Sequence, residues 1–428
     1  MTSTRYVVLG LARSRSAWLR AVARWATSGA VPIELVMCVS GAELAARLVE
    51  GRAVSAVLLD GTLADLDRDL LDLAARSSAA VFVVGGSRSG PDWRALGATA
   101  VLALDGEGGD LGREVLLDAL AEHASPVSRR GRDVVEPPST EPAPIGLRAL
   151  VAAVCGPGGT GTSTVAAALA LGLAATPRLG PVVLADLALH AEQAMLHDVG
   201  DVAPGVQELV DAHRSRTPSE AAVRAVTFEL APGGPHLLLG LRRARQWSTI
   251  RPRAFEAGFE SLCRSFDAVV CDVDADVEAG PVTGETADRC LFARVATGSA
   301  DVVLAVGRAG TKGIHALGRV TADLVESGVP PGRVVPVVVG GPRSPAARAA
   351  LAHAVAALAA AGSSGPLAPV LFLPSRRVDD AVRDGLPVPA PLPSLAAGAC
   401  SAVLNRLGPR VLPTTRPELV APGSLGAG

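Results

Sequence analysis

The stretch that most constrains the fold runs from Leu150 to Leu173 and reads LVAAVCGPGGTGTSTVAAALALGL. Its first part, Leu150 to Cys155, is a short apolar run typical of a buried strand. A glycine-rich turn follows from Gly156 to Gly161. The run Thr164–Leu173 then consists almost entirely of alanine and leucine, which are strong helix formers. The sequence therefore predicts a strand, a tight turn and a helix that opens at Thr162.

The glycine turn between this strand and helix favours binding of a phosphate group. Glycines let the backbone approach an anion closely, successive N–H groups point inward, and the helix dipole adds partial positive charge. Ser163 and Thr164 stand where a P-loop places its magnesium-ligating hydroxyl. We therefore expect a nucleotide to be bound by Gly158, Gly159, Thr160, Gly161, Thr162, Ser163 and Thr164.

The lysine that a P-loop normally carries is missing from this stretch. Thr162 stands at its position, and Pro157 stands where the variant motif KGGxGKT has a second lysine. Lys312 is the only lysine in the chain, so no lysine of this segment can serve. Two interpretations stay open: a nucleotide site with altered phosphate chemistry, or the glycine turn of an ordinary α/β unit.

Length and composition set wider limits on the protein. With 428 residues, 49% of them apolar, the chain is long enough for two domains that each bury a core. The net charge of −2 gives no general attraction to nucleic acid or anionic lipid. The six cysteines show no CxxC pair and no metal-ligand spacing. No apolar run reaches the ~18 residues of a membrane span and no leader is evident, so we expect a soluble cytoplasmic protein.

Residues 4–124 alternate short β-rich runs with helical ones, which predicts five βα units. The expected strands are 6–9, 33–38, 54–60, 80–84 and 100–104. The expected helices are 14–27, 41–50, 65–75, 91–96 and 112–123. This order predicts a doubly wound, flavodoxin-like parallel sheet over residues 1–124, and it resembles the receiver domain of response regulators.

The phosphorylation site of a receiver is incomplete here. Asp60 ends the third predicted strand, where the phospho-acceptor would stand, but Gly10 and Leu11 replace the acidic pair after the first strand. Gly85 replaces the hydroxyl after the fourth strand, and LALDGEG lacks the lysine expected after the fifth. Without the acidic pair there is no magnesium site. We therefore interpret Asp60 as a turn or cap residue, and residues 1–124 as a pseudo-receiver that serves docking or dimerisation.

Beyond this domain the sequence predicts three further segments. Residues 125–146 are rich in proline and polar residues and form a linker, and the Pro- and Gly-rich tail 409–428 is predicted to be flexible. Between them, residues 147–408 form a second α/β domain. Its expected strands are 150–155, 181–185, 236–240, 268–271, 302–306, 334–339 and 370–373. Nearly all are short apolar runs, as in a sheet covered by helices on both faces.

The order of signals in residues 147–408 resembles the MinD/ParA family of deviant Walker ATPases. GPGGTGTST at 156–164 is similar to the family P-loop, and FDAVVCDVDADVE at 266–278 to its Walker B strand. The resemblance implies a doubly wound, mostly parallel P-loop NTPase fold that binds ATP or ADP with Mg²⁺. It also implies magnesium binding by Ser163 and Asp272.

Two further positions take roles from the same resemblance. Asp186, at the end of the strand after the P-loop helix, is implied as the catalytic aspartate, which polarises the attacking water or supports magnesium through water. Pro374 is implied to line the nucleotide base, because FLPSRRVDDAVRDGLPV at 372–388 is similar to the family's last loop. Its matching positions are Pro374, Val378, Ala381, Gly385 and Pro387.

A receiver-like domain in front of such an ATPase is similar to the CpaE/TadZ proteins of Flp-pilus assembly. The missing P-loop lysines and the alanine-rich, lysine-poor sequence resemble most the actinobacterial septum-site-determining (Ssd) branch. This resemblance implies a spatial regulator that dimerises around nucleotide and helps position septum or Flp-pilus and secretion machinery. The same folded parts serve both uses, so the sequence does not choose between them.

The departures from the family pattern change the expected chemistry. Losing both lysines should harm hydrolysis more than binding, because the backbone amides, Ser163 and Asp272 remain. We therefore expect at most a weak ATPase. One alternative is an active ATPase in which an arginine replaces the lysine, with Arg242, Arg243, Arg245 and Arg308 as candidates. Another is a structural adaptor whose nucleotide pocket is closed.

Other binding functions receive little support from the sequence. The arginine-rich loop LRRARQWSTIRPR has one aromatic residue, Trp247, so no specific nucleic-acid partner is predicted. Asp276 and Glu278 are interpreted as caps of the next segment, and Asp274 follows the Walker B aspartate. The last helical segment, SLAAGACSAVLNRLG, carries a single arginine, so membrane contact is expected only through partners.

Overall fold

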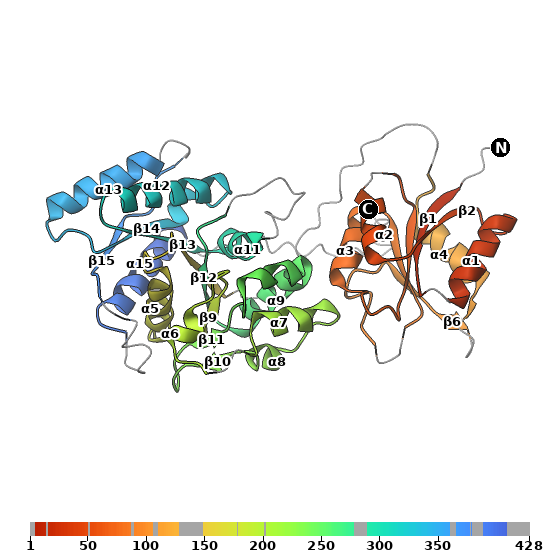
Figure 1. Ribbon diagram of the computed structural model, residues 1–428, viewed down its shortest axis with the longest axis horizontal. Helices are drawn as coiled ribbons and strands as arrows, with labels where there is room; N and C mark the ends of the chain where they lie inside the picture. Colours follow the sequence, from red (N-terminus) through yellow and green to blue (C-terminus); the bar gives the residue numbers. More distant parts are fainter. Residues whose placement is uncertain are drawn as a thin grey trace, which may run out of the picture. The chain divides into compact units, whose positions relative to one another are not determined.

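The computed structural model describes residues 5–13, 16–49, 52–86, 90–105, 110–127, 149–177, 179–200, 203–277, 289–359, 365–376, 378 and 388–408. These residues form two compact α/β units, one built on a five-stranded sheet and the other on an eight-stranded sheet (Figure 1). Most of the predicted linker 125–146 and the whole tail 409–428 lie outside the described residues. The domain boundaries therefore stay predictions.

The N-terminal unit alternates strands and helices as the sequence predicts. In chain order its main elements are β1 (Tyr6–Leu11), α1 (Ala17–Ser28), β2 (Ile33–Cys38), α2 (Gly41–Val49), β3 (Ala56–Asp60), α3 (Arg68–Arg76), β4 (Ala80–Val84), β5 (Ala100–Leu102) and α4 (Arg113–His123). The strand order is β2-β1-β3-β4-β5, and every pairing in this sheet is parallel. This is the flavodoxin-like order, so the predicted fold class of this unit is confirmed.

Both faces of this sheet are buried, because successive side chains of a strand point to opposite sides. Leu58 and Phe82 belong to a core cluster with residues of α1 and α4. Leu59 and Val83 belong to a second cluster with residues of α2 and α3. The strands β3 and β4 are buried along their whole length, which explains their unbroken apolar sequences AVLLD and AVFVV.

One predicted helix of this unit is wrong. Residues 91–96 form turns, and the buried Trp93 and Leu96 point their apolar side chains into the core next to β4. The segment ends at Gly97, whose φ of +116° no helix contains. Six residues that begin with a proline are too few to repay helix nucleation, so burial of Trp93 decides the local conformation. A short antiparallel pair, β6 (Leu104–Asp105) and β7 (Asp110–Leu111), was also not predicted.

The second unit is built on the longer sheet. Its strands are β8 (Leu150–Cys155), β9 (Val182–Asp186), β10 (Phe228–Glu229), β11 (His236–Leu238), β12 (Ala268–Val273), β13 (Val302–Arg308), β14 (Val334–Val339) and β15 (Leu371–Leu373). Its helices are α5 (Thr162–Ala174), α6 (Gln193–Leu196), α7 (Val206–Arg214), α8 (Glu220–Arg224), η1 (Ala244–Thr249), α9 (Pro252–Ser265), α11 (Leu291–Ser299), α12 (Thr311–Glu326), η2 (Pro331–Arg333), α13 (Pro345–Ala359) and α15 (Leu392–Leu407). All seven predicted strands are present with small shifts at their ends, and the edge strand β10 is additional.

The strand order of this sheet is β10-β11-β9-β12-β8-β13-β14-β15, and only the β10–β11 pair is antiparallel. β8 lies in the interior, paired with β12 on one side and with β13 on the other. The chain leaves β8 towards β9 and later returns to the opposite side at β13. Such a reversal makes a crevice at the carboxyl ends of the strands, where ligands bind in doubly wound sheets.

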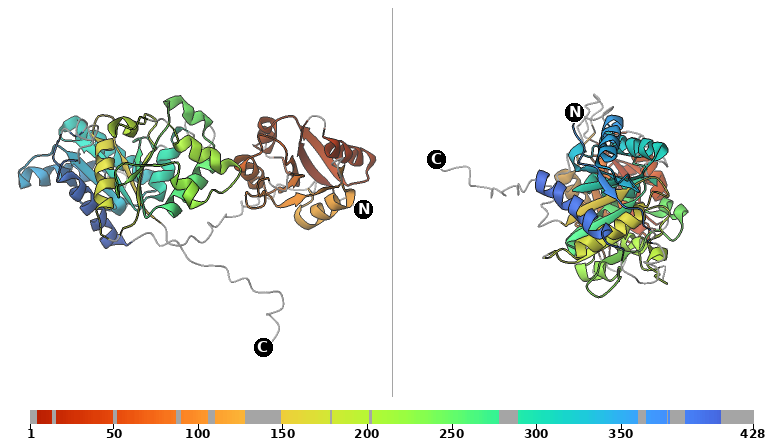
Figure 2. Two further views of the ribbon diagram at one scale, coloured as in Figure 1. Left: turned by 90° about the horizontal axis from the view of Figure 1, so that it is seen from below. Right: turned by 90° about the vertical axis from the view of Figure 1, so that its left-hand side faces the viewer.

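Helix α5 is the central helix of this unit. Eight of its residues are buried, and it packs against the sheet and lies side by side with α15, which also contacts the sheet (Figure 2). A Cβ on Gly172 would collide with the carbonyl oxygen of Pro393, so the two helices touch through backbone at this point. The alanine-rich sequence of α5 thus fits a helix that is surrounded on nearly all sides.

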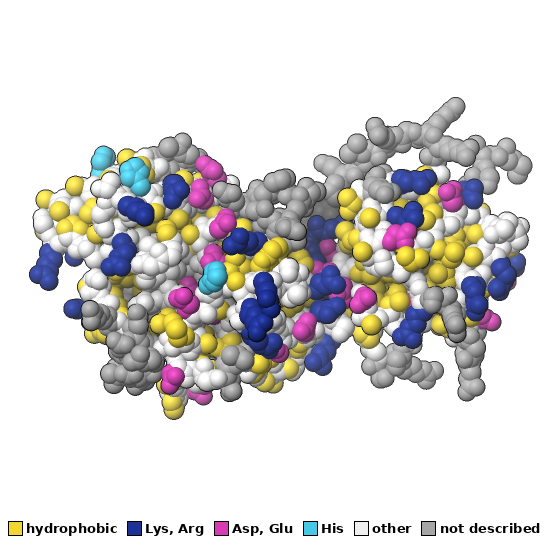
Figure 3. All heavy atoms as spheres, viewed as in Figure 1, with side chains coloured by type: hydrophobic (Ala, Val, Ile, Leu, Met, Phe, Trp, Pro, Cys, Tyr) yellow, Lys and Arg dark blue, Asp and Glu magenta, His cyan; other side chains and the backbone are white. Residues whose placement is uncertain are grey.

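The surface agrees with the small net charge. On the face shown in Figure 3, arginine side chains and acidic side chains are interspersed over both units. Within the described ranges, no helix is both long enough and apolar enough to cross a membrane.

Candidate nucleotide-binding site

The predicted glycine turn joins the interior of the sheet to helix α5. β8 ends at Cys155, α5 begins at Thr162, and Gly161 between them has a φ of +92°, a left-handed conformation that favours glycine. A Cβ on Gly156 would collide with the carbonyl oxygen of Val306 on β13, so only glycine fits where the turn leaves the strand. The predicted geometry of this stretch is confirmed residue by residue.

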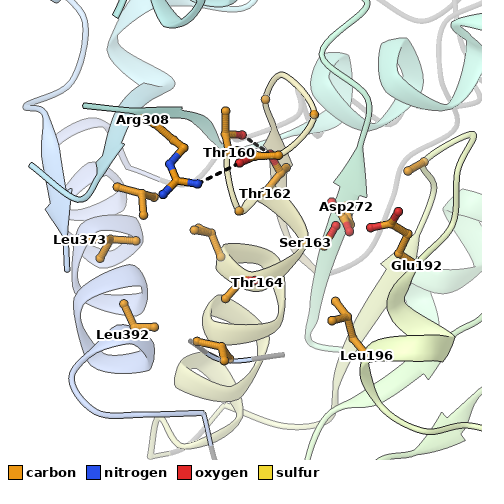
Figure 4. A pocket seen from close by; sticks show the side chains of 18 of the residues that line it. Thr160, Thr162, Ser163, Thr164, Glu192, Leu196, Asp272, Arg308, Leu373 and Leu392 are labelled. Atoms are coloured by element: carbon orange, nitrogen blue, oxygen red, sulfur yellow. Dashed lines mark hydrogen bonds between the residues drawn. The ribbon is translucent and has the colours of Figure 1, made fainter. Parts of the chain in front are cut away.

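A cavity of about 540 Å³ opens beside this turn (Figure 4). Every residue predicted to bind nucleotide lines it, and so does Asp272. The lining residues from that prediction are Gly158, Gly159, Thr160, Gly161, Thr162, Ser163, Thr164 and Pro374. Other parts of the wall follow β9, β12, β13 and β15, and they include Ala188, His190, Glu192, Asp274, Arg308, Ser375 and Arg376. This volume is typical of cavities that bind small molecules of the size of a nucleotide.

The two predicted magnesium ligands lie together in this cavity. Asp272 is the fifth residue of β12 and is buried, while Ser163 lies in the first turn of α5. The Ser163 side chain interacts with the Asp272 carboxylate and lowers its pKa, and Figure 4 shows both side chains at the same end of the cavity. In the described part of the chain, no group of three or more His, Cys, Asp or Glu could hold a metal. One hydroxyl and one carboxylate fit Mg²⁺, which otherwise takes its oxygens from water and substrate phosphates.

Asp186, the predicted catalytic residue, lies behind this pair. It ends β9 and sits in register with Asp272 on the neighbouring strand. Its side chain is buried and accepts a hydrogen bond of 2.9 Å at Oδ2 from the backbone N–H of Gln193. Asp186 is not among the residues that line the cavity. Its catalytic role therefore stays a prediction, and its contacts connect it to the magnesium-side carboxylate.

Gln193 connects these groups and was not predicted from the sequence. It opens the short helix α6 and is completely buried. Its Nε2 donates to Asp272 Oδ2 at 2.7 Å and to the Ser163 carbonyl oxygen at 3.0 Å. One residue, through its side-chain amide and its backbone N–H, thus ties the P-loop helix to both aspartates. The surrounding sequence HAEQAML carries no signal that marks this glutamine, because the contact joins residues far apart in the chain.

Burial changes the acidity of the two aspartates. Burial raises the pKa of Asp272 to about 6; Asp274 and Glu192 add to the rise, while the hydrogen bonds from Gln193 and Ser163 oppose it. Burial, followed by the charge of Asp272, raises the pKa of Asp186 well above its ordinary value. Two carboxylates in adjacent buried positions resist being ionised together. A divalent cation beside Asp272 would relieve that repulsion.

The two positions that lack lysine carry neutral groups. Thr162 Oγ1 lies 3.0 Å from Thr160 Oγ1, which in turn donates to the Pro157 carbonyl oxygen at 2.7 Å. These contacts close the turn on itself and bring no positive charge to it. The loop therefore supplies amides and hydroxyls, but no side-chain cation.

The four candidate arginines separate clearly in the structure. Arg308, the last residue of β13, lines the cavity, and its Nη1 donates to the Gly159 carbonyl oxygen at 3.4 Å. Arg242 forms an ion pair with Glu208 instead. Neither Arg242 nor Arg243 nor Arg245 lines the cavity. Arg376, which follows β15 and was not among the candidates, does line it.

The remaining predicted acidic residues play smaller parts. Asp274 lines the cavity and accepts a hydrogen bond of 2.8 Å from the Leu189 N–H. Asp276 lies next to Cys290. Glu278 and the segment that it was expected to cap lie outside the described residues, as do Ala381, Gly385 and Pro387.

In the N-terminal unit, the interpretation of Asp60 as a turn residue is confirmed. Its Oδ1 accepts hydrogen bonds from the Thr62 N–H at 2.9 Å and from the Thr62 hydroxyl at 2.6 Å. Gly10 and Leu11 belong to strand β1, and both are buried. The carboxylate is thus engaged in a local turn, with no acidic side chain at the two positions where a receiver has its pair.

Fold and site together define the class of this domain. It is a doubly wound α/β domain with a P-loop-type turn, a hydroxyl and a carboxylate together at Ser163 and Asp272, and a cavity at the switch point of its sheet. No protein-family profile matches the sequence, and no curated protein matches it.

Solved structures do resemble it, and three are representative. A ParA family ATPase from Chlorobium tepidum TLS has 14% identity, covers 61% of this chain and 93% of its own, with a TM-score of 0.41. The MinC:MinD cell division complex of Aquifex aeolicus has 15% identity, with 63% and 99% covered and a TM-score of 0.43. The septum site-determining protein MinD from Pyrococcus horikoshii OT3, complexed with Mg-ADP, has 18% identity, with 61% and 99% covered and a TM-score of 0.42. The similarity concerns the fold.

Proposed function

We propose that this protein is a nucleotide-dependent spatial regulator of the CpaE/TadZ/Ssd type, which helps position septum or Flp-pilus and secretion machinery. One observation carries the nucleotide part of the proposal. The glycine turn, Ser163 and Asp272 open onto a single cavity of about 540 Å³, although they come from different strands and helices. An ordinary α/β connection has no reason to collect these groups around an open space.

The roles of the residues follow from their chemistry. Backbone N–H groups of the turn and the N-terminus of α5 bind phosphate oxygens. Ser163 and Asp272 hold Mg²⁺, which when bound neutralises phosphate charge. Pro374 borders the part of the cavity that follows β15, where the base is expected. Gln193 fixes the orientation of Asp272 through its 2.7 Å hydrogen bond.

The same geometry favours binding over hydrolysis. Phosphoryl transfer depends on positive charge around the γ-phosphate, and Thr162 and Pro157 supply none. Asp186 reaches the site only through Gln193 and Asp272, since it does not line the cavity. We therefore propose a weak ATPase whose nucleotide state controls a homodimer and its partners. The active ATPase and the nucleotide-free adaptor are the alternatives that the experiment must separate.

Calorimetric titration with ATP and ADP in the presence of Mg²⁺ tests the proposal. We expect micromolar binding by the wild-type protein, with clear losses for Ser163→Ala and for Asp272→Ala. Ser248→Ala is the matched control, because its hydroxyl bonds the Arg245 carbonyl oxygen in the exposed helix η1. Absence of heat and of any thermal shift at millimolar ATP would support the adaptor. Steady-state turnover at rates normal for P-loop ATPases would support the active enzyme.

The positional part of the proposal needs a separate measurement. A fluorescent fusion is expected to concentrate at the septum or at a cell pole, and to lose that pattern when Ser163→Ala removes nucleotide binding. A uniform distribution of the wild-type fusion would contradict the positional role and leave the nucleotide site unaffected.

A further inference from the structure

The cavity has acidic side chains on one side and basic side chains on the other. Acidic side chains line it on the side of β9 and β12, namely Glu192, Asp272 and Asp274. Arginines line it where β13 and β15 end, namely Arg308 and Arg376. The acidic side suits a metal ion. The arginine side has no purpose in a metal site, and it calls for an anion.

Arg308 lies next to the P-loop because of the strand order. β13 pairs with β8 in parallel, with Ala305 opposite Cys155, the last residue before the turn. Three residues further, Arg308 has passed the end of β8 and stands beside the glycine turn. Figure 4 shows its guanidinium directed toward the turn, with one donor facing the Gly159 carbonyl oxygen.

The contacts of Arg308 leave its charge available. The hydrogen bond to Gly159 measures 3.4 Å, at the weak end of the range. Among the residues that the structure describes, no carboxylate lies within 4.0 Å of the guanidinium in an ion pair. A guanidinium has five N–H donors in a rigid fork, and phosphate oxygens are the partners that this fork fits best.

We propose that Arg308 binds the β- and γ-phosphates in place of the missing P-loop lysine, reaching them from β13 rather than from the start of α5. This inference rests on the proposed nucleotide binding. It explains how Thr162 can be neutral, because a neighbouring strand supplies a charge that balances the bound phosphates. Hydrolysis stays weak, because Pro157 supplies no second cation and Asp186 does not line the cavity. It also selects one of the four arginines that sequence reasoning left open.

Titration with ATP, ADP and AMP separates a phosphate contact from a structural role. For Arg308→Ala we expect about tenfold or greater loss of ATP and ADP affinity, as for removal of a charged hydrogen bond, and an unchanged affinity for AMP. Arg308→Lys should recover part of the loss, because it restores the charge without the fork. Arg245→Ala is the control, since it removes an exposed arginine that does not line the cavity. Equal losses in the two alanine variants, or an equal loss for AMP, would overturn the assignment.

A restored lysine gives the second test. Thr162→Lys is expected to recover ATP affinity in the Arg308→Ala background, and to add much less to the wild-type protein, because one cation then does the work of the other. Independent effects in this double-mutant cycle would contradict the inference. Absence of ATP binding by the wild-type protein would remove the proposed function and this inference together. Wild-type binding that Arg308→Ala leaves intact would remove the inference alone.

Discussion

Gln193 Nε2 donates a hydrogen bond of 2.7 Å to Asp272 Oδ2, while the Gln193 backbone N–H donates to Asp186 Oδ2 at 2.9 Å. One residue at the start of α6 therefore holds two aspartates that lie in register on adjacent strands. The same side chain also donates to the Ser163 carbonyl oxygen at 3.0 Å. The candidate metal site, the P-loop helix and the buried Asp186 thus share one positioning residue.

Replacing that residue should destabilise the P-loop unit. Gln193→Ala removes the amide donor of the buried Asp272 carboxylate, which costs about 1–3 kcal/mol in the free energy of unfolding. Urea unfolding monitored by circular dichroism measures this cost. Gln246→Ala is the control, because its side chain accepts one hydrogen bond, from the Arg243 N–H, in the short helix η1. Equal effects of the two substitutions would show that the bridge contributes nothing.

The raised pKa of Asp272 should make the protein less stable as pH rises. Burial raises the pKa of Asp272 from 3.8 to about 6, so the native state holds this proton more tightly than the unfolded chain does. Between these values the native state binds more protons, and the free energy of unfolding therefore falls as pH rises. The raised pKa of Asp186 continues the fall to higher pH. The contribution of Asp272 amounts to ~3 kcal/mol.

Unfolding of the wild-type protein and of Asp272→Asn at several pH values, without nucleotide, measures this contribution. The difference between the two curves should shrink or reverse sign as pH rises from acid to neutral. Asp118→Asn, in the exposed part of α4, should follow the wild-type curve. Parallel wild-type and Asp272→Asn curves would contradict the prediction. Because Mg²⁺ needs the ionised carboxylate, affinity for Mg-ATP should rise through the same pH range.

Two glycines of the P-loop turn should respond differently to one methyl group. In Gly156→Ala the new Cβ meets the Val306 carbonyl oxygen and lies 2.7 Å from Thr162 Oγ1, so the turn must move. Overpacking of this kind costs about 1–3 kcal/mol. A Cβ on Gly158 meets nothing within 4 Å, which makes Gly158→Ala the matched control for folding. Thermal unfolding of both variants checks the prediction, and equal melting temperatures would contradict it.

The receiver-like unit should not respond to phosphoryl analogues. The Asp60 carboxylate accepts hydrogen bonds from Thr62, and neither Gly10 nor Leu11 has a side chain that could bind magnesium. Beryllofluoride with Mg²⁺ should leave the amide spectrum around residue 60 unchanged. Asp60→Ala should instead cost stability, about 1 kcal/mol, through loss of the turn hydrogen bonds. Saturable, magnesium-dependent shifts at this turn would show that a receiver site exists after all.

The elements that the sequence predicts best are those with an unbroken apolar or alanine-rich run that is bounded by glycines. The strand at Leu150–Cys155 and the helix start at Thr162 agree with the structure, because apolar runs and glycine turns act locally. The prediction of a helix at 91–96 was wrong, because the burial of Trp93 outweighs a weak helical pattern. The two-residue edge strand β10 is too short to carry a pattern at all.

The candidate site divides in the same way. All predicted loop residues, Pro374 and Asp272 line one cavity, since motif residues that follow parallel strands meet at one edge of the sheet. Gln193 and Arg376 were not predicted, because a single glutamine or arginine outside a motif has no characteristic spacing. Arg308 could be named but not chosen from four arginines. Only the pairing of β13 with β8 brings it to the P-loop.

The packing of α5 against α15 has a consequence for truncated and recombinant forms of this domain. The P-loop opens α5, and α15 is the last described helix, so most of the domain's sequence separates two helices that share one contact surface. At Gly172 the two helices are in backbone contact, because a Cβ there would meet the Pro393 carbonyl oxygen. A recombinant or truncated chain that ends before Leu392 would expose an alanine- and leucine-rich face to water, and such faces promote aggregation. The P-loop helix and the last described helix therefore depend on each other for the burial of their shared apolar face.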